Sequence, residues 1–182
     1  MRPVSERALS YPAGSLAQAA ALVLLAGSAF ALAAAWYFQL VVGLAPCPLC
    51  LDQRLAYYFA IPVGLATLLA ARAGRPGLAR ALLAVLGLAM LANMGLAMYH
   101  AGVEWAFWPG PAACTGAPVL TGDILSALKG ARVPRCDEAA WRLLGLSMAG
   151  WNALIAAALA AVGLGGAALE PAPISLHRKR IG

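Results

Sequence analysis

Four strongly apolar stretches of the sequence contain no charged residue, and they restrict the possible folds more than any other feature. They are residues 8–51, 55–71, 81–103 and 143–169. A helix needs roughly 20 apolar residues to cross a bilayer, with about 17 as the lower limit. The second stretch meets this limit narrowly, and Arg54 and Arg72 at its ends can extend their aliphatic stems toward the membrane surfaces. Because lipid offers no partners for exposed backbone groups, each stretch is predicted to be a helix.

Composition agrees with a membrane location. Of the 182 residues, 63% are hydrophobic and only 11% are charged, which is more apolar surface than one soluble domain of this size can bury. We therefore predict an all-α polytopic membrane protein with a single membrane domain, residues 1–182, built as a four-transmembrane-helix bundle. The spans are expected at about 15–40, 55–73, 78–100 and 143–168, joined on the outer side by loops at about 41–54 and 101–142.

The second outer loop contains one further predicted element. Residues 121–131 have apolar positions on one helical face and Asp123 as a possible N-cap, which predicts a short amphipathic helix on the membrane surface. A solvated helical turn is the alternative. The apolar core of the first span, from Leu16 to about Gln39, is longer than the roughly 7–15 residues of a signal-peptide core. The first span is therefore expected to be retained.

Basic residues are distributed unevenly between the two sides of this topology. The termini and the loop between the second and third spans carry eight basic and two acidic residues, whereas the outer loops carry five of each. By the positive-inside rule, both termini are expected in the cytoplasm and both outer loops outside it. The basic segment at 177–180 is explained by this topology, so no nucleic-acid partner is predicted.

All four cysteines lie in the outer loops, at Cys47, Cys50, Cys114 and Cys136. An even number of cysteines confined to the extracytoplasmic side indicates disulfide chemistry in an oxidising compartment. Two structural disulfides, a four-thiolate zinc site and a redox relay are the three interpretations. A disulfide between Cys47 and Cys50 closes almost no loop and would stabilise little. The second pair lacks the close spacing of zinc ligands. These points favour the redox relay and predict no metal site.

Cys50 has the surroundings of a reactive thiol. If the second helix begins near Cys50, Arg54 lies one turn further along the same face. The positive end of the helix dipole and the guanidinium would both stabilise a thiolate. A thiolate at the lipid edge can donate electrons to an acceptor dissolved in the membrane. The alternative role for Arg54 is that of an interfacial anchor.

The segment APCPLCLDQR at 45–54 resembles the C-x-L-C…R signature of the bacterial disulfide-bond formation protein B family. Segments 99–116 and 136–152 resemble the flanks of that family's second outer loop. The resemblance implies a quinone-dependent protein disulfide oxidoreductase of the bacterial inner membrane. Such an enzyme re-oxidises a periplasmic thioredoxin-like thiol oxidase of the disulfide-bond protein A type and passes the electrons to ubiquinone or menaquinone.

The same resemblance implies a role for each site residue. Cys114 would form the mixed disulfide with the partner, and Cys136 would pair with Cys114 at rest and exchange with Cys47. Cys50 would face the quinone beside Arg54. His100 resembles a family histidine near the quinone, and an ordinary interfacial histidine is the alternative.

Two other functions remain open from the sequence. One is a quinone-coupled thiol enzyme similar to vitamin K epoxide reductase, in which the CxxC pair usually lies late in the chain. Here the pair lies between the first two predicted spans, which favours the disulfide-bond formation protein B family. The other is a non-catalytic membrane scaffold with two structural disulfides.

Overall fold

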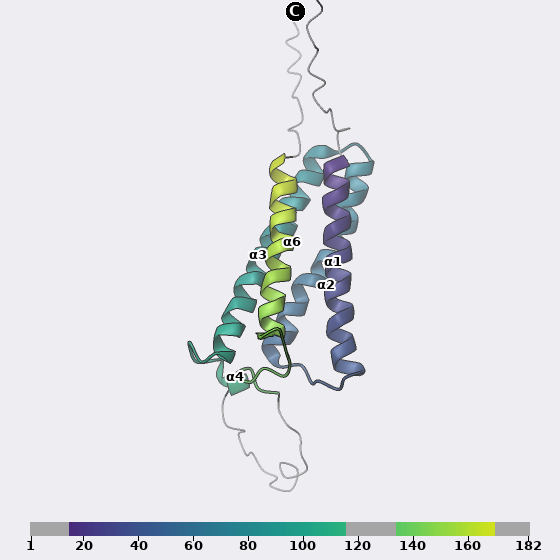
Figure 1. Cartoon of the computed structure of the whole chain (residues 1–182). Helices are drawn as coiled ribbons and strands as arrows, with labels where there is room; N and C mark the ends of the chain where they lie inside the picture. Colours follow the sequence, from purple (N-terminus) through teal and green to yellow (C-terminus); the bar gives the residue numbers. More distant parts are fainter. Residues whose placement is uncertain (1–14, 116–133, 170–182) are drawn as a thin grey trace, which may run out of the picture.

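The computed structural model describes residues 15–115 and 134–169. Four long helices run alternately up and down one bundle (Figure 1): α1 (Ser15–Leu40), α2 (Pro48–Arg72), α3 (Pro76–Glu104) and α6 (Met148–Leu169). All four are long and apolar enough to cross a membrane. The prediction of an all-α bundle of four membrane-spanning helices is confirmed. The amphipathic helix expected at 121–131 lies outside the described residues.

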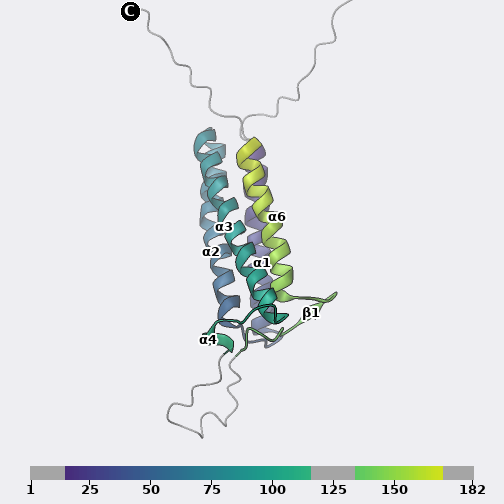
Figure 2. The same cartoon turned by 90° about the vertical axis from the view of Figure 1, so that its left-hand side faces the viewer.

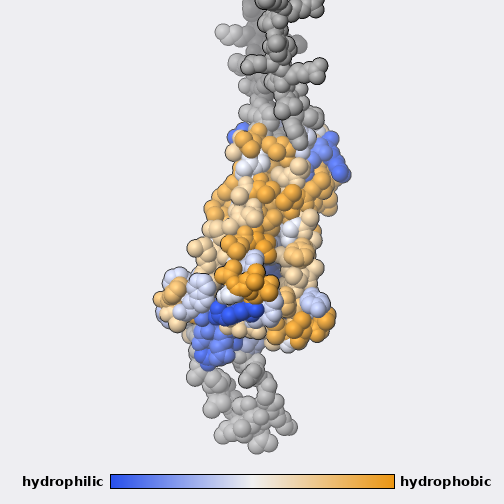
Figure 3. Space-filling model, in the orientation of Figure 1, coloured by the Kyte–Doolittle hydropathy of each residue, from blue (hydrophilic) through white to orange (hydrophobic). Residues whose placement is uncertain are grey.

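The helices form a ring in which α1 and α3 each pack against both α2 and α6. Figure 2 gives the view at right angles, in which α3 and α6 run close together along their length. Hydrophobic residues cover most of the visible face in Figure 3, and hydrophilic residues gather mainly at its two ends. We call the end where α1 and α3 finish and α2 and α6 start the cysteine end of the bundle.

Two helices begin at positions that differ from the expected spans. The second helix starts at Pro48, before the span expected from 55 and close to the helix start considered near Cys50, because Cys47 is its N-cap and Pro48 occupies the first turn, where proline is favoured. The fourth starts at Met148 and not at 143. Before it, β1 (Arg142–Leu143) and β2 (Leu146–Ser147) form a short antiparallel hairpin. Its two turn residues, Leu144 and Gly145, have φ of 51° and 83°, as a tight hairpin turn requires.

A small aromatic contact holds the segment that follows α3. The indole of Trp108 donates a hydrogen bond to the backbone oxygen of Tyr99 at 2.9 Å, and the two rings stack with an interplanar angle of 4°. Gly102 lies directly beneath the Trp108 ring, where any Cβ would collide with it. This contact fixes the start of the segment that leads to α4 (Ala112–Thr115), the helix that carries Cys114.

The backbones of α3 and α6 touch where two glycines face each other. A Cβ placed on Gly163 would lie 2.7 Å from the Cα of Gly87, closer than side chains approach backbone in folded proteins. Small residues at such crossings are typical of membrane helices, because lipid provides little hydrophobic drive for helix association and close packing replaces it.

We expect the substitution Gly163→Ala to destabilise the bundle by on the order of 1–3 kcal/mol, since one of two backbones must shift to admit the methyl group. Gly165→Ala is the matched control, because a Cβ there meets nothing within 4 Å. Thermal unfolding of both variants in the same detergent checks this expectation. Equal melting temperatures for the two variants would contradict the close contact.

Candidate redox site

The structure brings all four cysteines together at the cysteine end. Cys47, Cys114 and Cys136 are buried with Leu49 and Val103 in one cluster, and Cys50 packs against it. Cys114 and Cys136 form a disulfide, whereas Cys47 and Cys50 are free thiols. The backbone N–H of Cys136 also donates to the carbonyl oxygen of Cys114 at 3.0 Å. Two separate sulfur pairs therefore share one apolar environment.

The two thiols of the CxxC pair have different surroundings. Their sulfur atoms lie 2.8 Å apart, and the backbone N–H of Cys50 points to the Sγ of Cys47 at 3.3 Å. Cys47 is only 4% exposed, whereas Cys50 is partly exposed. The hydrogen bond with Cys50 and, after it, burial raise the pKa of the Cys47 thiol. Cys47 is thus suited to remain a thiol that donates its proton toward the sulfur of Cys50.

A four-thiolate zinc site does not fit this arrangement, because Cys114 and Cys136 are bonded to each other. The donor atoms of Cys47, Cys50 and His100 do lie within 4.8 Å of one another. A tetrahedral zinc ion with Zn–S bonds of about 2.3 Å would hold two thiolates roughly 3.8 Å apart. The observed separation of 2.8 Å between the two sulfurs is much shorter and suits a pair that can close to a disulfide.

His100 lies beside Cys47 at the end of a chain of buried polar side chains. The Nε2 of His100 is 3.6 Å from the Sγ of Cys47, and the ring is 2% exposed. Its Nδ1 is 2.9 Å from the side-chain nitrogen of Gln53. Since an amide nitrogen can only donate, Nδ1 accepts and the neutral imidazole carries its proton on Nε2, which faces the sulfur. The ring also lies beside the backbone of Cys136.

The polar chain continues across the centre of the bundle from α2 to α6. The amide of Asn152 donates to the Oε1 of Gln53 at 2.6 Å, and the hydroxyl of Tyr57 donates to the Oδ1 of Asn152 at 2.5 Å. Gln53 and Tyr57 are 5% and 3% exposed. In an apolar interior each of these groups needs a partner, so the chain fixes both amide orientations and the orientation of the His100 ring.

Arg54 lies on α2 one turn after Cys50 and reaches toward α1. Its Nη1 donates to the Oε1 of Gln39 at 2.6 Å, and its guanidinium carbon is 5.7 Å from the centre of the Trp36 ring. It is also close enough to act electrostatically on Cys50. The direct contacts of Arg54 are thus with α1, and Cys50 lies one turn before it on α2. His100 lies beside Cys47.

The family described as Disulfide bond formation protein DsbB has a model that matches residues 17–165 of this chain. The chain belongs to the disulfide bond formation protein B family. A relative named Disulfide bond formation protein B from Marinobacter nauticus is 37% identical over 144 residues, which are 73% of this chain and 81% of the relative. Proteins of the same name from Saccharophagus degradans and Shewanella sp. are 34% and 33% identical, each over 72% of this chain, and the matches cover 81% and 77% of their own lengths. No solved structure matches the chain.

Membership of this family, together with four helices that can span a membrane, makes the protein a multi-pass membrane protein of disulfide bond formation. Four further residues belong to this arrangement and were not predicted from the sequence: Gln53, Tyr57, Glu104 and Asn152. Uncharged polar residues inside or at the ends of membrane spans were an available signal, because such residues are rare in lipid unless they pair within the bundle. Their partners lie far apart in the sequence and could not be assigned from it.

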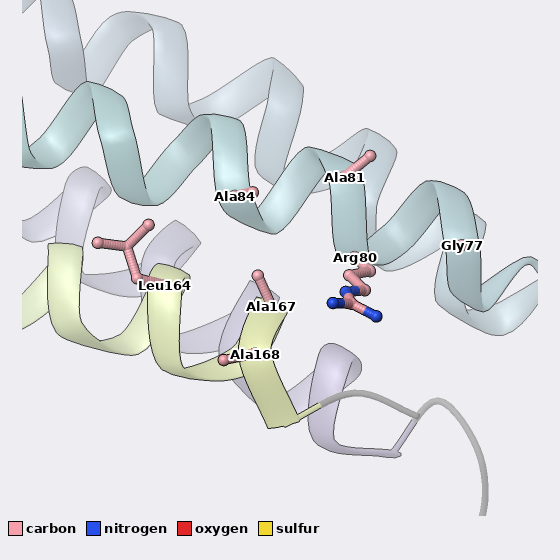
Figure 4. Close-up of a pocket in the computed structure, with 7 residues that line it drawn as sticks. All are labelled: Gly77, Arg80, Ala81, Ala84, Leu164, Ala167 and Ala168. Carbon is pink, nitrogen blue, oxygen red and sulfur yellow. The ribbon is translucent and has the colours of Figure 1, made fainter. Parts of the chain in front are cut away.

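A cavity of about 410 Å³ lies at the opposite end of the bundle, between α3 and α6. Figure 4 shows its lining, in which Arg80 supplies a guanidinium among small apolar residues: Gly77, Ala81, Ala84, Leu164, Ala167 and Ala168. None of the cysteines lines it, so it is not part of the redox site of this family member.

The buried polar chain can be tested with a double-mutant cycle. Tyr57→Phe and Asn152→Leu should each lower the free energy of unfolding, because each leaves a buried partner unpaired at a cost of about 1–3 kcal/mol. In the Asn152→Leu background, Tyr57→Phe should lower the free energy of unfolding by less than it does in the wild type. The difference is the coupling energy, expected at about 0.5–1.5 kcal/mol. Thermal unfolding of the wild type, both single variants and the double variant measures this coupling. Strictly additive effects would show that the two side chains are not linked.

Proposed function

We propose that this protein is a quinone-dependent thiol oxidase of a bacterial inner membrane. It oxidises a thioredoxin-like periplasmic dithiol partner of the disulfide-bond protein A type and passes the electrons through its two cysteine pairs to ubiquinone or menaquinone. Its termini are cytoplasmic and its cysteines periplasmic. The observation that carries the proposal is the shared cluster of Cys47, Cys50, Cys114 and Cys136, with one disulfide and one dithiol at the start of a membrane-spanning helix.

The path through the chain follows thiolate attack on disulfides. A partner thiolate attacks the Sγ of Cys114, forming a mixed disulfide and releasing Cys136 as a thiolate. The second partner thiolate then attacks the partner sulfur of the mixed disulfide. This breaks the bond to Cys114, releases Cys114 as a thiolate and leaves the partner oxidised. Reduced Cys114 and Cys136 next reduce a Cys47–Cys50 disulfide by the same exchange, with Cys136 attacking Cys47. Each step moves two electrons, and the burial of both pairs in one cluster supports direct exchange between them.

The residues around Cys50 fit a flat ring with carbonyl oxygens. Cys50 is partly exposed, and Leu51 and Leu55 on the same helix are 48% and 63% exposed, which offers apolar contact to a ring in the lipid. The Arg54 guanidinium offers hydrogen-bond donors to a ring oxygen. A quinone supplies the capacity to accept two electrons and two protons. The helix N-terminus and Arg54 hold Cys50 as the electron-donating thiolate, and His100 orients Cys47 for closure of the disulfide.

The principal test is a coupled assay with the purified full-length protein. A reduced thioredoxin-like periplasmic oxidase and a short-chain ubiquinone are added, and quinone absorbance is followed. We expect the absorbance to fall as the partner is oxidised, whereas Cys114→Ser should abolish partner oxidation. Titration of free thiols in that variant should still find Cys47 and Cys50 oxidised by quinone. Unchanged absorbance with the wild type, where a verified family member turns over, would refute the proposed function.

Arg54 gives a narrower prediction. Arg54→Gln should raise the apparent KM for quinone about tenfold, because it removes a charge-assisted hydrogen bond worth roughly 1.5–3 kcal/mol. Arg54→Lys keeps the charge but lacks the planar guanidinium, so its KM for quinone should lie between the values of the wild type and of Arg54→Gln. Steady-state kinetics at saturating partner measure the effect. If KM and kcat are unaltered in Arg54→Gln, Arg54 serves only as an anchor between α1 and α2.

A further inference from the structure

We propose that Glu104 takes up one proton when the Cys47–Cys50 disulfide is reduced and releases it when the disulfide forms again. The inference rests on the proposed function only in that the Cys47–Cys50 pair must cycle between disulfide and dithiol. Glu104 does not touch the sulfurs directly. It holds the proton beside His100, which lies between the carboxyl group and Cys47.

Glu104 is buried at the cysteine end, at the last position of α3. Its side chain is 5% exposed, and its Oε1 lies 3.9 Å from the Nε2 of His100. That same Nε2 is 3.6 Å from the Sγ of Cys47, so the imidazole edge lies between the carboxyl group and the thiol. The Oε2 of Glu104 has no hydrogen-bond partner among the described residues. A buried carboxylate oxygen without a donor is costly, and a proton on the carboxyl group removes that cost.

The charge balance of the dithiol requires a second proton holder. Reduction of a disulfide with full protonation consumes two electrons and two protons and yields two thiols. If Cys50 is held as a thiolate, the reduced pair carries both electrons but only the one proton on Cys47. A negative charge is then left in a buried cluster that already contains the Glu104 carboxylate, whose charge acts on both sulfurs. A proton bound to Glu104 keeps the net charge of the cluster the same as in the oxidised form, and both protons leave with the two electrons on re-oxidation.

Few other groups can compensate the charge of Glu104. Besides Cys47 and Cys50 on α2, the titratable or charged groups that face it are His100 on its own helix and Arg142 on β1, and the Ser147 hydroxyl of β2 lies beside it. Arg142 is exposed and forms no ion pair with Glu104 within the described part of the chain. The side-chain amide of Gln53 donates a hydrogen bond to the Nδ1 of His100, which is the pattern of a neutral imidazole. Glu104 is therefore the group whose protonation can follow the redox state.

Infrared difference spectroscopy of the full-length protein, oxidised minus chemically reduced, tests this proposal without quinone or partner. The reductant is a phosphine at a concentration that leaves Cys114–Cys136 and Cys47–Cys50 both reduced, as thiol titration verifies. We expect reduction to produce the carbonyl stretch of a protonated carboxylic acid in the wild type. The band should be lost in Glu104→Gln and shifted in Glu104→Asp. Glu138→Gln is the matched control, because Glu138 is 75% exposed.

The outcomes separate the two proposals. If thiol titration finds that the Cys47–Cys50 pair cannot be cycled, the proposed function fails. If the pair is reduced but the wild type gives no carboxylic acid band, or the band survives in Glu104→Gln, Glu104 is not the proton holder. A second measurement uses the equilibrium of the Cys47–Cys50 pair with glutathione against pH. Near neutral pH, Glu104→Gln should bind about one proton fewer per two electrons than the wild type. Equal proton counts would also overturn the inference.

Discussion

Lipid cannot solvate a polar group, and the arrangement of the site depends on this constraint. Buried polar side chains in the bundle therefore require partners within it if they are to avoid a desolvation cost. Tyr57, Asn152, Gln53 and His100 meet this requirement as one chain that joins α2, α6 and α3. The chain ends with the Nε2 of His100 directed at Cys47. The contacts that satisfy these four side chains therefore also hold the imidazole of His100 beside the thiol of Cys47.

The two cysteines of the CxxC pair show how one short segment acquires two roles. Cys47 lies just outside the helix as its N-cap and is buried in the cluster, whereas Cys50 lies in the first turn and is partly exposed. The helix dipole and Arg54 act on Cys50, and the polar chain acts on Cys47. Pro48 between them supports both placements, because it can start a helix without leaving a backbone donor unpaired. The difference between the thiols follows from where the helix begins.

Much of the fold could be predicted because lipid imposes strict lengths. Charge-free stretches such as 81–103 are long enough for only one structure in a membrane. The expected spans place the cysteines at one end of the bundle, where the structure has Cys50 in the first turn of α2 and Cys114 in α4. The predicted ends of the helices differ more from the structure, because hydropathy indicates where lipid contact ends and not where the backbone changes conformation. The tight turn at Leu144 and Gly145 lies in an apolar stretch and carries no hydropathy signal. The pairing of Tyr57 with Asn152 depends on tertiary packing between residues far apart in sequence.

Two carboxylates near the cysteines illustrate why position in the sequence does not decide chemistry. Asp137 follows Cys136 directly, yet it lies at the surface and accepts two hydrogen bonds from Arg135 at 2.9 and 2.5 Å. The hydrogen bond from Arg135 holds the pKa of Asp137 below its ordinary value, which favours the ionised form of this side chain. Glu104 is further from any cysteine in the sequence but is buried against His100, and one of its oxygens has no partner among the described residues. A buried carboxyl group that forms no ion pair with an arginine can respond to charge on a neighbouring sulfur. Within the described residues at this end of the bundle, Glu104 is such a group, whereas Asp137 is paired with Arg135.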